Sequence, residues 1–260
     1  MLLGANIDHI AVLREARKIS DPNPLDAIPI VKLSGANQIT IHLREDRRHI
    51  NDIDASNIVK LSPLPINLEC ATSKEIIDIV CSLKPHRATI VPEKRKEVTT
   101  EGGLSVLGEQ SRLKESIALL HQNEIEVSLF IDPSVDSVNA SKELGGVEWV
   151  EFHTGRYANI YAMLNGNLIN TPHSIKNLEL PRAKLKELLD DEISTIYNVS
   201  KLAHNLGLKV AGGHGLNYQN VKAIANIEYI EELNIGQSII ARSVFTGLER
   251  AILDMRELIK

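Results

Sequence analysis

Short runs of apolar residues recur along the chain, and each is followed by a segment with helical spacing. Eight such runs are rich in Ile, Val and Leu and show almost no alternation between apolar and polar positions. Runs of this kind are typical of strands that are buried on both faces, as in a parallel sheet. The predicted strands are Leu2–Ile7, Gln38–Leu43, Pro65–Cys70, Ala88–Val91, Glu126–Ile131, Trp149–Phe152, Leu208–Ala211 and Glu232–Ile235.

Apolar residues at steps of three and four predict helices between these strands. Several of the helical segments end at a turn signal that contains glycine, such as Gly35 or Gly207, and glycine readily adopts the left-handed conformation that ends a helix. The predicted helices are Leu25–Leu33, Ala55–Leu61, Lys74–Leu83, Glu109–Gln122, Val135–Leu144, Pro181–Leu206, Tyr218–Ala225 and Val244–Ile259.

The alternation of strands and helices favours one α/β domain, a (β/α)8 or TIM barrel that spans residues 1–260. Eight units in 260 residues average about 32 residues each, the usual size of a βα repeat. A doubly wound sheet is the competing architecture, but its Gly-rich first turn is absent here, where Asn6-Ile7-Asp8-His9-Ile10 follows the first strand. The segment Arg156–Glu179 predicts an extended loop, a lid or extra helices after the sixth strand.

Composition and charge narrow the class of protein. The chain has 29 Lys and Arg against 34 Asp and Glu, a net charge of -5, and only 3% aromatic residues. Nucleic-acid binders usually carry a basic excess and aromatic stacking platforms, so no nucleic-acid partner is expected. No apolar run approaches the roughly 20 residues of a membrane span. The two cysteines form neither a disulfide framework nor a zinc motif. We therefore expect a soluble, cytoplasmic protein.

Polar residues concentrate where the predicted strands end, whereas the opposite ends carry mostly Gly, Pro, Ser and Lys. In a barrel the carboxyl ends of all strands meet at one face, which is where barrel enzymes hold their active sites. The sequence thus predicts an enzyme with one site at the mouth of the barrel. The strand-end residues include Asn6, Asp8, His9, His42, Arg44, His49, Glu69, Asp132, Glu151, His153, His214, Gly236 and Gln237.

Glu69 and His42 are the first candidates for proton transfer. Glu69 lies in an otherwise apolar strand, and burial of an inward-facing carboxyl raises its pKa toward the range useful for acid/base work. The alternative is a structural carboxylate that pairs with an Arg or caps the next helix. His42 shares a strand face with Thr40 and Arg44. It is either a proton-transfer group beside an anion site or a core histidine held by a hydrogen bond.

Two segments are candidates for anion binding. Arg44, Arg47, Arg48 and His49 form a cationic cluster that could hold a phosphate, although Glu45 and Asp46 could neutralise part of it. We expect one or two of these residues to be functional and the others structural. The glycine-rich segment 212–215 and Gly236 follow the seventh and eighth strands, where many barrels bind phosphate through backbone N–H groups. Glycines of tight turns without a ligand are the alternative. No spacing enforces a metal site, and none is predicted.

At these residues the chain resembles pyridoxine 5'-phosphate synthase, the family of the deoxyxylulose-dependent vitamin B6 pathway. The matching segments run in order from the first strand to the last, and two of them are long and specific: Leu43–Ile50, L-R-E-D-R-R-H-I, and Val91–Leu104, V-P-E-K-R…E-V-T-T-E-G-G-L. The other segments are Gly4–Ala11, Asn67–Glu69, Val127–Asp132, His153–Gly155, Gly213–Leu216 and Glu232–Gly236.

The resemblance implies a (β/α)8 barrel that joins 3-amino-2-oxopropyl phosphate to 1-deoxy-D-xylulose 5-phosphate. The products are pyridoxine 5'-phosphate, phosphate and water, and no metal or organic cofactor takes part. It also implies His42 and Glu69 as proton acceptors, His214 as proton donor and Glu151 as the group that stabilises charge in the transition state. Asp8, His9, Arg44, His49 and Thr99 would hold the deoxyxylulose phosphate, and Asn6, Arg17, Gly215, Gly236 and Gln237 would hold the aminoketone phosphate.

Two further implications concern assembly and departures from the family. The resemblance implies a homo-octamer in which Arg17 reaches the site of a neighbouring subunit. The family often has histidine where this chain has Gln237, and the segment Arg156–Glu179 is longer than is usual in the family. Other readings of the same residues are a sugar-phosphate isomerase or aldolase on this barrel, and an inactive barrel that only binds phosphorylated metabolites. An aldolase would need an inward-facing lysine.

Overall fold

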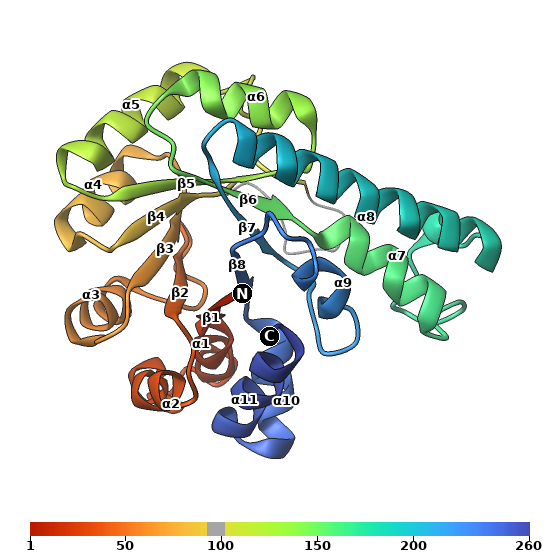
Figure 1. The fold of residues 1–260 in the computed structure, drawn as a ribbon. Coiled ribbons are helices and arrows are strands. Elements are labelled where there is room, and N and C mark those ends of the chain that lie inside the picture. Colours follow the sequence, from red (N-terminus) through yellow and green to blue (C-terminus); the bar gives the residue numbers. More distant parts are fainter. Residues whose placement is uncertain (93–101) are drawn as a thin grey trace.

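A closed barrel of parallel strands forms the centre of the computed structural model, which describes residues 1–92 and 102–260 (Figure 1). Within these residues eight strands pair in chain order, and β8 pairs with β1 to close the ring. This confirms the (β/α)8 prediction and excludes the doubly wound sheet, whose edge strands stay unpaired. The strands are β1 (Leu2–Asn6), β2 (Gln38–Leu43), β3 (Ile66–Cys70), β4 (Arg87–Ile90), β5 (Glu126–Ile131), β6 (Trp149–His153), β7 (Lys209–Gly213) and β8 (Glu232–Ile235).

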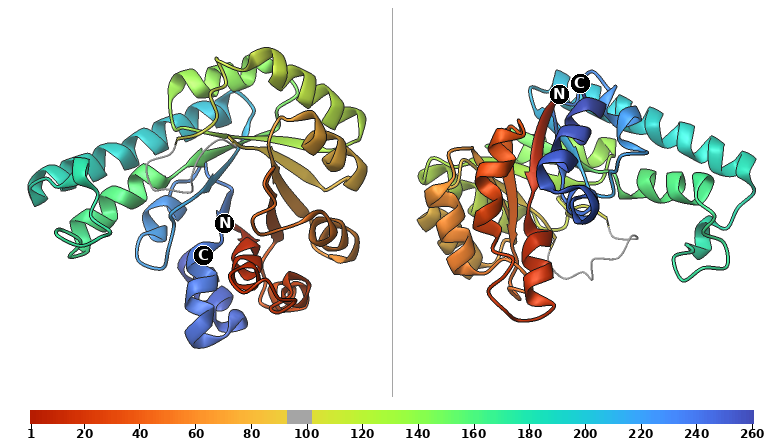
Figure 2. Two further views of the ribbon diagram at one scale, coloured as in Figure 1. Left: turned by 180° about the vertical axis from the view of Figure 1, so that it is seen from behind. Right: turned by 90° about the horizontal axis from the view of Figure 1, so that it is seen from below.

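Helices surround the barrel, and both chain termini lie at the same end of it (Figure 2). Short 3-10 turns, η1 (Pro24–Asp26) and η2 (Lys176–Leu178), precede α2 and α8. The helices are α1 (Asp8–Glu15), α2 (Ala27–Leu33), α3 (Asp52–Leu61), α4 (Lys74–Leu83), α5 (Gln110–Gln122), α6 (Val135–Leu144), α7 (Gly155–Asn165), α8 (Arg182–Asn205), α9 (Val221–Ala225), α10 (Gln237–Thr246) and α11 (Leu248–Leu258).

Two helix predictions need correction. Helix α1 was missed because its eight residues mix the polar residues of the first strand end with a short apolar stripe. The single helix expected over Val244–Ile259 is two helices, α10 and α11, because the chain turns at Gly247 with a φ of 79°. Helix α7 occupies the first half of the segment Arg156–Glu179, where extra helices were one of the predicted alternatives.

The remainder of that segment does not lie over the barrel. Helices α7 and α8 run side by side and project outward, and the chain between them turns at the outer end of this arm (Figures 1 and 2). Leu168, Ile175 and Leu178 of the connection pack against a small hydrophobic cluster of the two helices, which includes Ile160 and Leu185. The connection is therefore part of the arm that α7 and α8 form.

The main hydrophobic core lies between the barrel and the helices, not inside the barrel. Along β2, Ile39, Ile41 and Leu43 face outward into the core, and the intervening Thr40 and His42 face inward. The same alternation of apolar outward and polar inward residues recurs on β3, β4 and β8. The strands therefore do alternate, contrary to the sequence analysis. The apolar residues of these strands form their outer faces, which the helices bury, and the polar residues point into the barrel.

Candidate active site

The ends of β1, β2 and β3 bring four predicted site residues together at the mouth of the barrel. The Nδ1 atom of His42 lies 3.7 Å from Oε2 of Glu69. Asp8 holds this pair in place, since its Oδ1 accepts a hydrogen bond of 2.9 Å from the backbone N–H of His42. Asn6 in turn donates from Nδ2 to Oδ2 of Asp8 at 2.9 Å. The side chain of Glu69 is 18% exposed, so an imidazole and a carboxylate in contact face the space above the barrel.

The loop after β2 places His49 beside His42, with ring centroids 6.1 Å apart. Nδ1 of His49 accepts a hydrogen bond of 2.9 Å from the backbone N–H of Ile50, so in the neutral ring Nε2 carries the proton and serves as a donor. Helix α1 supports the loop, because Arg14 donates to the carbonyl of His49 at 3.0 Å. Arg14 also forms two hydrogen bonds with Asp54, of 2.8 and 2.7 Å, and these raise its pKa further.

The residues of the cationic cluster in this loop differ in burial. Arg44 is buried, with Nε 3.3 Å from Oδ1 of Asp46. Arg47 instead turns to the surface, where it bonds Asp52 at 3.2 Å and Glu75 at 2.6 Å. Arg48 also faces outward and forms a 2.6 Å ion pair with Asp46, whose pKa this hydrogen bond lowers to about 2. Carboxylate partners thus hold Arg47 and Arg48, and Arg44 and His49 line the inner side of the loop.

On the opposite side of the mouth, His214 follows β7 with a φ of 75°, a left-handed conformation that is uncommon outside glycine. Its ring centroid lies 4.9 Å from that of His153 at the end of β6. Nδ1 of His153 lies 3.5 Å from Oδ1 of Asp132, at the end of β5. Asp132 and His153 thus stand beside the predicted proton donor. The sequence analysis named both only as strand-end residues.

The glycines after β7 and β8 are required for close packing. A Cβ atom at Gly236 would lie 2.8 Å from Cβ of Asn6, and one at Gly215 would lie 2.6 Å from Cβ of Ala158. Gly236 is also the residue before α10, whose first residue is the exposed Gln237. The N–H groups at the start of this helix carry partial positive charge, which suits an anion.

Glu151 does not lie at the mouth, as the sequence analysis placed it, but in the middle of β6 inside the barrel. Burial raises its pKa to about 8, the nearby Glu232 adds to the effect, and a hydrogen bond from Asn234 opposes it. The carboxyl group of Glu151 is therefore largely protonated at neutral pH. A buried carboxyl of this kind is typical of active sites.

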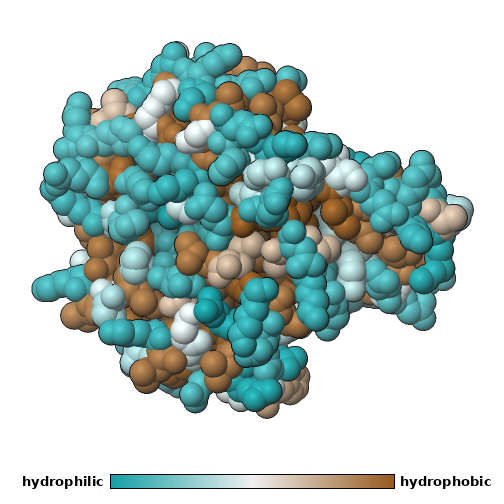
Figure 3. All heavy atoms as spheres, in the orientation of Figure 1, coloured by the Kyte–Doolittle hydropathy of each residue, from teal (hydrophilic) through white to brown (hydrophobic). Residues whose placement is uncertain are grey.

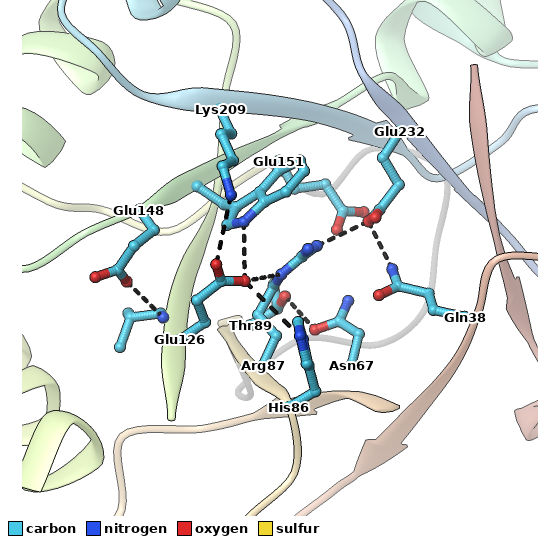
Figure 4. Close-up of polar contacts among 12 residues, drawn as sticks. Gln38, Asn67, His86, Arg87, Thr89, Glu126, Glu148, Glu151, Lys209 and Glu232 are labelled. Carbon is cyan, nitrogen blue, oxygen red and sulfur yellow. Dashed lines mark hydrogen bonds and ion pairs between the residues drawn. The ribbon is translucent and has the colours of Figure 1, made fainter. Parts of the chain in front are cut away.

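Beneath Glu151 lies a set of inward-facing side chains that we call the barrel floor (Figure 4). The sequence analysis expected plain residues at the amino ends of the strands, and this is wrong. Arg87 forms a 2.8 Å ion pair with Glu232, bonds Glu126 at 3.3 Å and stacks 3.8 Å above the ring of Trp149. The signal that was missed is the alternation of polar residues within single strands. The floor consists of the first residues of six strands: Gln38, Arg87, Glu126, Trp149, Lys209 and Glu232.

Three more of the predicted residues remain to be located. Thr99 lies outside the described residues. His9 is the second residue of α1 and is half-buried. Arg17 is exposed just beyond the end of α1. Among the residues that the structure describes, no cluster of three or more His, Cys, Asp or Glu side chains could hold a metal ion. Residues 1–92 and 102–260 contain no helix that is both long and apolar enough to cross a bilayer.

A closed parallel barrel with imidazoles and carboxyls gathered at the carboxyl ends of its strands is the framework of a (β/α)8-barrel enzyme. A model of the family "Pyridoxal phosphate biosynthesis protein PdxJ" matches residues 3–260, and the chain belongs to this family. It is 68% identical over 259 residues to a pyridoxine 5'-phosphate synthase of Sulfurovum sp. (strain NBC37-1), covering 100% of both chains. It is also 68% identical to a pyridoxine 5'-phosphate synthase of Aliarcobacter butzleri (strain RM4018), covering 100% of this chain and 99% of that one.

Solved structures of low sequence identity share the fold. KGPDC from Streptococcus mutans superposes with a TM-score of 0.62 at 10% identity, covering 99% of this chain and 96% of that one. A 3-hexulose-6-phosphate synthase gives a TM-score of 0.60 at 12% identity, with both chains fully covered. At such identities the likeness concerns only the barrel.

Proposed function

We propose that this chain is a pyridoxine 5'-phosphate synthase, which joins 3-amino-2-oxopropyl phosphate to 1-deoxy-D-xylulose 5-phosphate in vitamin B6 biosynthesis. The ring-closing condensation releases pyridoxine 5'-phosphate, inorganic phosphate and water. The observation that carries this proposal is 68% identity over the full length to proteins of that name. The contact between His42 and Glu69 at the mouth of the barrel supports it, because the reaction requires repeated proton transfers.

The proton-transfer residues are divided between two sides of the mouth. His42 and Glu69 act as proton acceptors on the side of β2 and β3, where their 3.7 Å contact allows either to orient the other. His214 acts as proton donor on the side of β7, with His153 beside it. Glu151 stabilises charge in the transition state from below. Groups with different environments around one pocket suit a sequence of several acid and base steps.

Two phosphorylated substrates need two anion sites. Asp8, His9, Arg44, His49 and Thr99 hold the deoxyxylulose phosphate. The guanidinium of Arg44 and the Nε2–H of His49 supply the positive charge and the hydrogen-bond donor on the inner side of their loop.

The aminoketone phosphate binds across the mouth, at Asn6, Arg17, Gly215, Gly236 and Gln237. The start of α10 supplies backbone N–H groups for the phosphate. Because this contact uses the backbone, Gln237 replaces the histidine that is frequent in the family without loss of the site. The reaction needs neither a metal nor an organic cofactor.

We also propose that the chain, as one domain of residues 1–260, works in the cytoplasm as a homo-oligomer, an octamer by analogy with the family. Phe245 of α10 is 89% exposed, and Val244 beside it is 66% exposed. Helix α1 contacts α10 and exposes Val12 and Leu13. Apolar side chains grouped in this way are typical of a protein interface. Figure 3 shows that hydrophobic residues also reach the surface over α2 and α11. Arg17 follows α1, so association through this face would carry it toward a second subunit.

The test is a turnover assay with both phosphates on chelator-treated protein, following phosphate release and the mass of pyridoxine 5'-phosphate. We expect product from the wild type and a loss of about 10²–10⁴-fold in Glu69→Gln, which keeps the shape of the side chain but not its basicity. Exposed Glu75→Gln is the matched control and should retain activity. Binding of either phosphate without product would favour the inactive barrel instead. Turnover of a single phosphate would favour an isomerase.

A further inference from the structure

The proposed reaction leaves unexplained why the protein buries an ion pair directly beneath Glu151. Nη1 of Arg87 and Oε1 of Glu232 are 2.8 Å apart, with side chains only 5% and 3% exposed (Figure 4). Removing two charges from water is costly, and an apolar floor of the same volume is often at least as stable. The polar and stacking contacts of this pair within residues 1–92 and 102–260 are with other interior side chains, so its role has to be sought in what it touches.

Asn234 links the pair to Glu151. Its Nδ2 donates to Oε2 of Glu151 at 2.7 Å and lies 3.3 Å from Oε1 of Glu232. Its Oδ1 accepts from Oγ1 of Thr40 at 2.9 Å and from Nε2 of Gln38 at 3.2 Å. The groups that contact Oδ1 are donors and the groups that contact Nδ2 are carboxyls, so one orientation of the Asn234 amide group suits all four. Asn234 therefore presents a hydrogen-bond donor, and never an acceptor, to Glu151.

Two glycines make room for this arrangement. A Cβ atom added at Gly4 of β1 would overlap Oδ1 of Asn234, and one added at Gly213 of β7 would overlap Oε1 of Glu151. Both positions face the interior, where any side chain would displace the amide or the carboxyl. The backbones of β1 and β7, the strands on either side of β8, therefore leave the space that the side chains of Asn234 and Glu151 occupy.

The charges around Glu151 determine which group carries a proton. Two cations, Arg87 of β4 and Lys209 of β7, face two carboxylates, Glu126 of β5 and Glu232 of β8. Arg87 and Glu232 neutralise each other close to Glu151, whereas Lys209 is half-exposed beside Glu126, so an ionised Glu151 would add an unpaired negative charge to the interior. A buried charge without a partner is strongly disfavoured, so the proton resides on Glu151.

The other titratable groups near this network face away from Glu151. His153, the next inward-facing residue of β6, directs Nδ1 toward Asp132. His86, before β4, lies at the rim with Nδ1 4.0 Å from Glu126. Neither offers Glu151 a second partner.

We propose that Asn234 is a positioning residue for Glu151, and that Glu232, held in place by Arg87, keeps the Glu151 carboxyl uncharged and aimed at the substrates. Because Oε2 accepts the hydrogen bond from Asn234, the proton is on Oε1, which lies against Gly213, the residue before His214. Glu151 thus presents an O–H donor to the mouth. A neutral donor stabilises negative charge that develops on a substrate oxygen, as an oxyanion hole does.

This inference rests on the proposed function for the role of Glu151, but its central test does not require turnover. Infrared difference spectra of the substrate-free protein across a pH series report the carbonyl band of a protonated carboxyl. Glu151→Gln identifies which band belongs to Glu151. In the wild type we expect that band at neutral pH and its loss only in alkaline solution.

Two variants then test the electrostatic support. Glu232→Gln removes a neighbouring negative charge, so the titration midpoint of Glu151 should fall by about 1 pH unit or more. The double variant Arg87→Met/Glu232→Gln removes both members of the pair, leaves no unpaired charge, and should return the midpoint toward the wild-type value. Lys209→Gln is the control, since it changes a half-exposed charge that faces Glu126, and should leave the midpoint in place. If Glu232→Gln does not fold, Arg87→Met replaces it: the unpaired Glu232 carboxylate should then raise the midpoint of Glu151, and an unchanged midpoint would overturn the inference.

Asn234→Leu tests positioning. The variant removes the hydrogen bond that Asn234 donates to ionised Glu151, so the titration midpoint of Glu151 should rise, whereas Glu232→Gln should lower it. The value of kcat should fall by about tenfold or more at an unchanged KM. Equal midpoints in the wild type, Glu232→Gln and Asn234→Leu would overturn the inference, even in an active enzyme. The expected shifts in a protein without synthase activity would support the network and overturn only the proposed function.

Discussion

The mouth and the floor of the barrel use the same residue types and differ in what surrounds them. At the mouth, the side chains of His42 and Glu69 contact each other and are 11% and 18% exposed. At the floor, Arg87 and Glu232 are sealed among strands, with every partner supplied by the protein. Titratable groups that reach solvent can meet a substrate, whereas groups sealed inside the barrel can only set the environment of a neighbour. The contrast separates partly exposed titratable residues from sealed ones.

The largest effect is expected on turnover from His42→Asn at the mouth. The variant removes the imidazole that contacts Glu69, so kcat should fall by about 10²–10⁴-fold. Stability should change little, because Asp8 holds His42 through its backbone N–H and not through the ring. Steady-state turnover and urea unfolding check both parts. Exposed His173→Asn is the matched control. Activity within tenfold of the wild type would remove His42 from the catalytic set.

At the floor, substitutions should affect the free energy of unfolding most. Arg87→Met leaves Glu232 buried without its partner, which should lower the free energy of unfolding by about 3–5 kcal/mol. Arg47→Met is the control from the surface, where the loss of partners in solvent should cost less than about 1 kcal/mol. Urea denaturation of the two variants measures the difference. Similar losses in both would contradict the distinction between buried and exposed pairs.

The pH dependence of stability should separate Glu151 from Glu126, a carboxyl of the floor. Burial raises the pKa of Glu151 to about 8, above its value in the unfolded chain. The contribution of Glu151 to the free energy of unfolding is therefore complete in acid, and it is lost as the pH rises through the pKa of the folded state. Relative to Glu151→Gln, the wild type should lose on the order of 3 kcal/mol between about pH 5 and about pH 9.

Glu126 provides the opposite case. Burial tends to raise its pKa, but Arg87 and Lys209 outweigh this and hold the pKa below its ordinary value. The contribution of Glu126 to the free energy of unfolding is therefore present at neutral pH and is lost in acid. Urea midpoints of Glu126→Gln across the same pH series should approach those of the wild type as the pH falls. Parallel curves for the Glu151 and Glu126 variants would show that their environments do not differ as the structure indicates.

The smallest effect compares two adjacent glycines of β7. Gly213→Ala would push a methyl group against Glu151, so it should cost about 1–3 kcal/mol and reduce turnover. Gly212 faces the helices, and a Cβ atom there would lie 3.4 Å from Cδ2 of Leu233, an ordinary contact. Gly212→Ala should therefore change stability by less than about 1 kcal/mol, in either direction. Thermal unfolding and turnover of the two variants test whether Glu151 needs the space at Gly213. Equal effects of the two substitutions would argue against this.

Much of the fold could be predicted because the signal is local. The strand β2 and the helix α4 have the predicted limits, since apolar patterning within each segment decides where it begins and ends. The prediction failed where a local pattern was ambiguous. Helix α1 is short and begins with site residues, and the break at Gly247 lies inside a continuous apolar stripe. The polar alternation of the strands was visible in the sequence, but its meaning depends on closure of the barrel.

The site was predicted unevenly for the same reason. Glu69 and His42 stand out as polar residues in apolar strands, and motif resemblance implied their roles. Arg87 and Asn234 carry no such signal, because their partners are far away in the chain. Arg87 pairs with a residue 145 positions later, and Asn234 accepts from one 196 positions earlier. No spacing rule reaches so far.

The amino-acid sequence by itself determined the barrel, the end of it that carries the chemistry and the family to which the chain belongs. These follow from the periodicity of side chains and from contiguous motifs, both of which are properties of short segments. Only the tertiary structure decided that Glu151 is buried, that Asn234 holds it and that the charges of the floor balance without it. The physical reason is that the pKa of a carboxyl depends on the solvent and charges within a few ångströms, and closure of the barrel brings these together from strands distant in sequence.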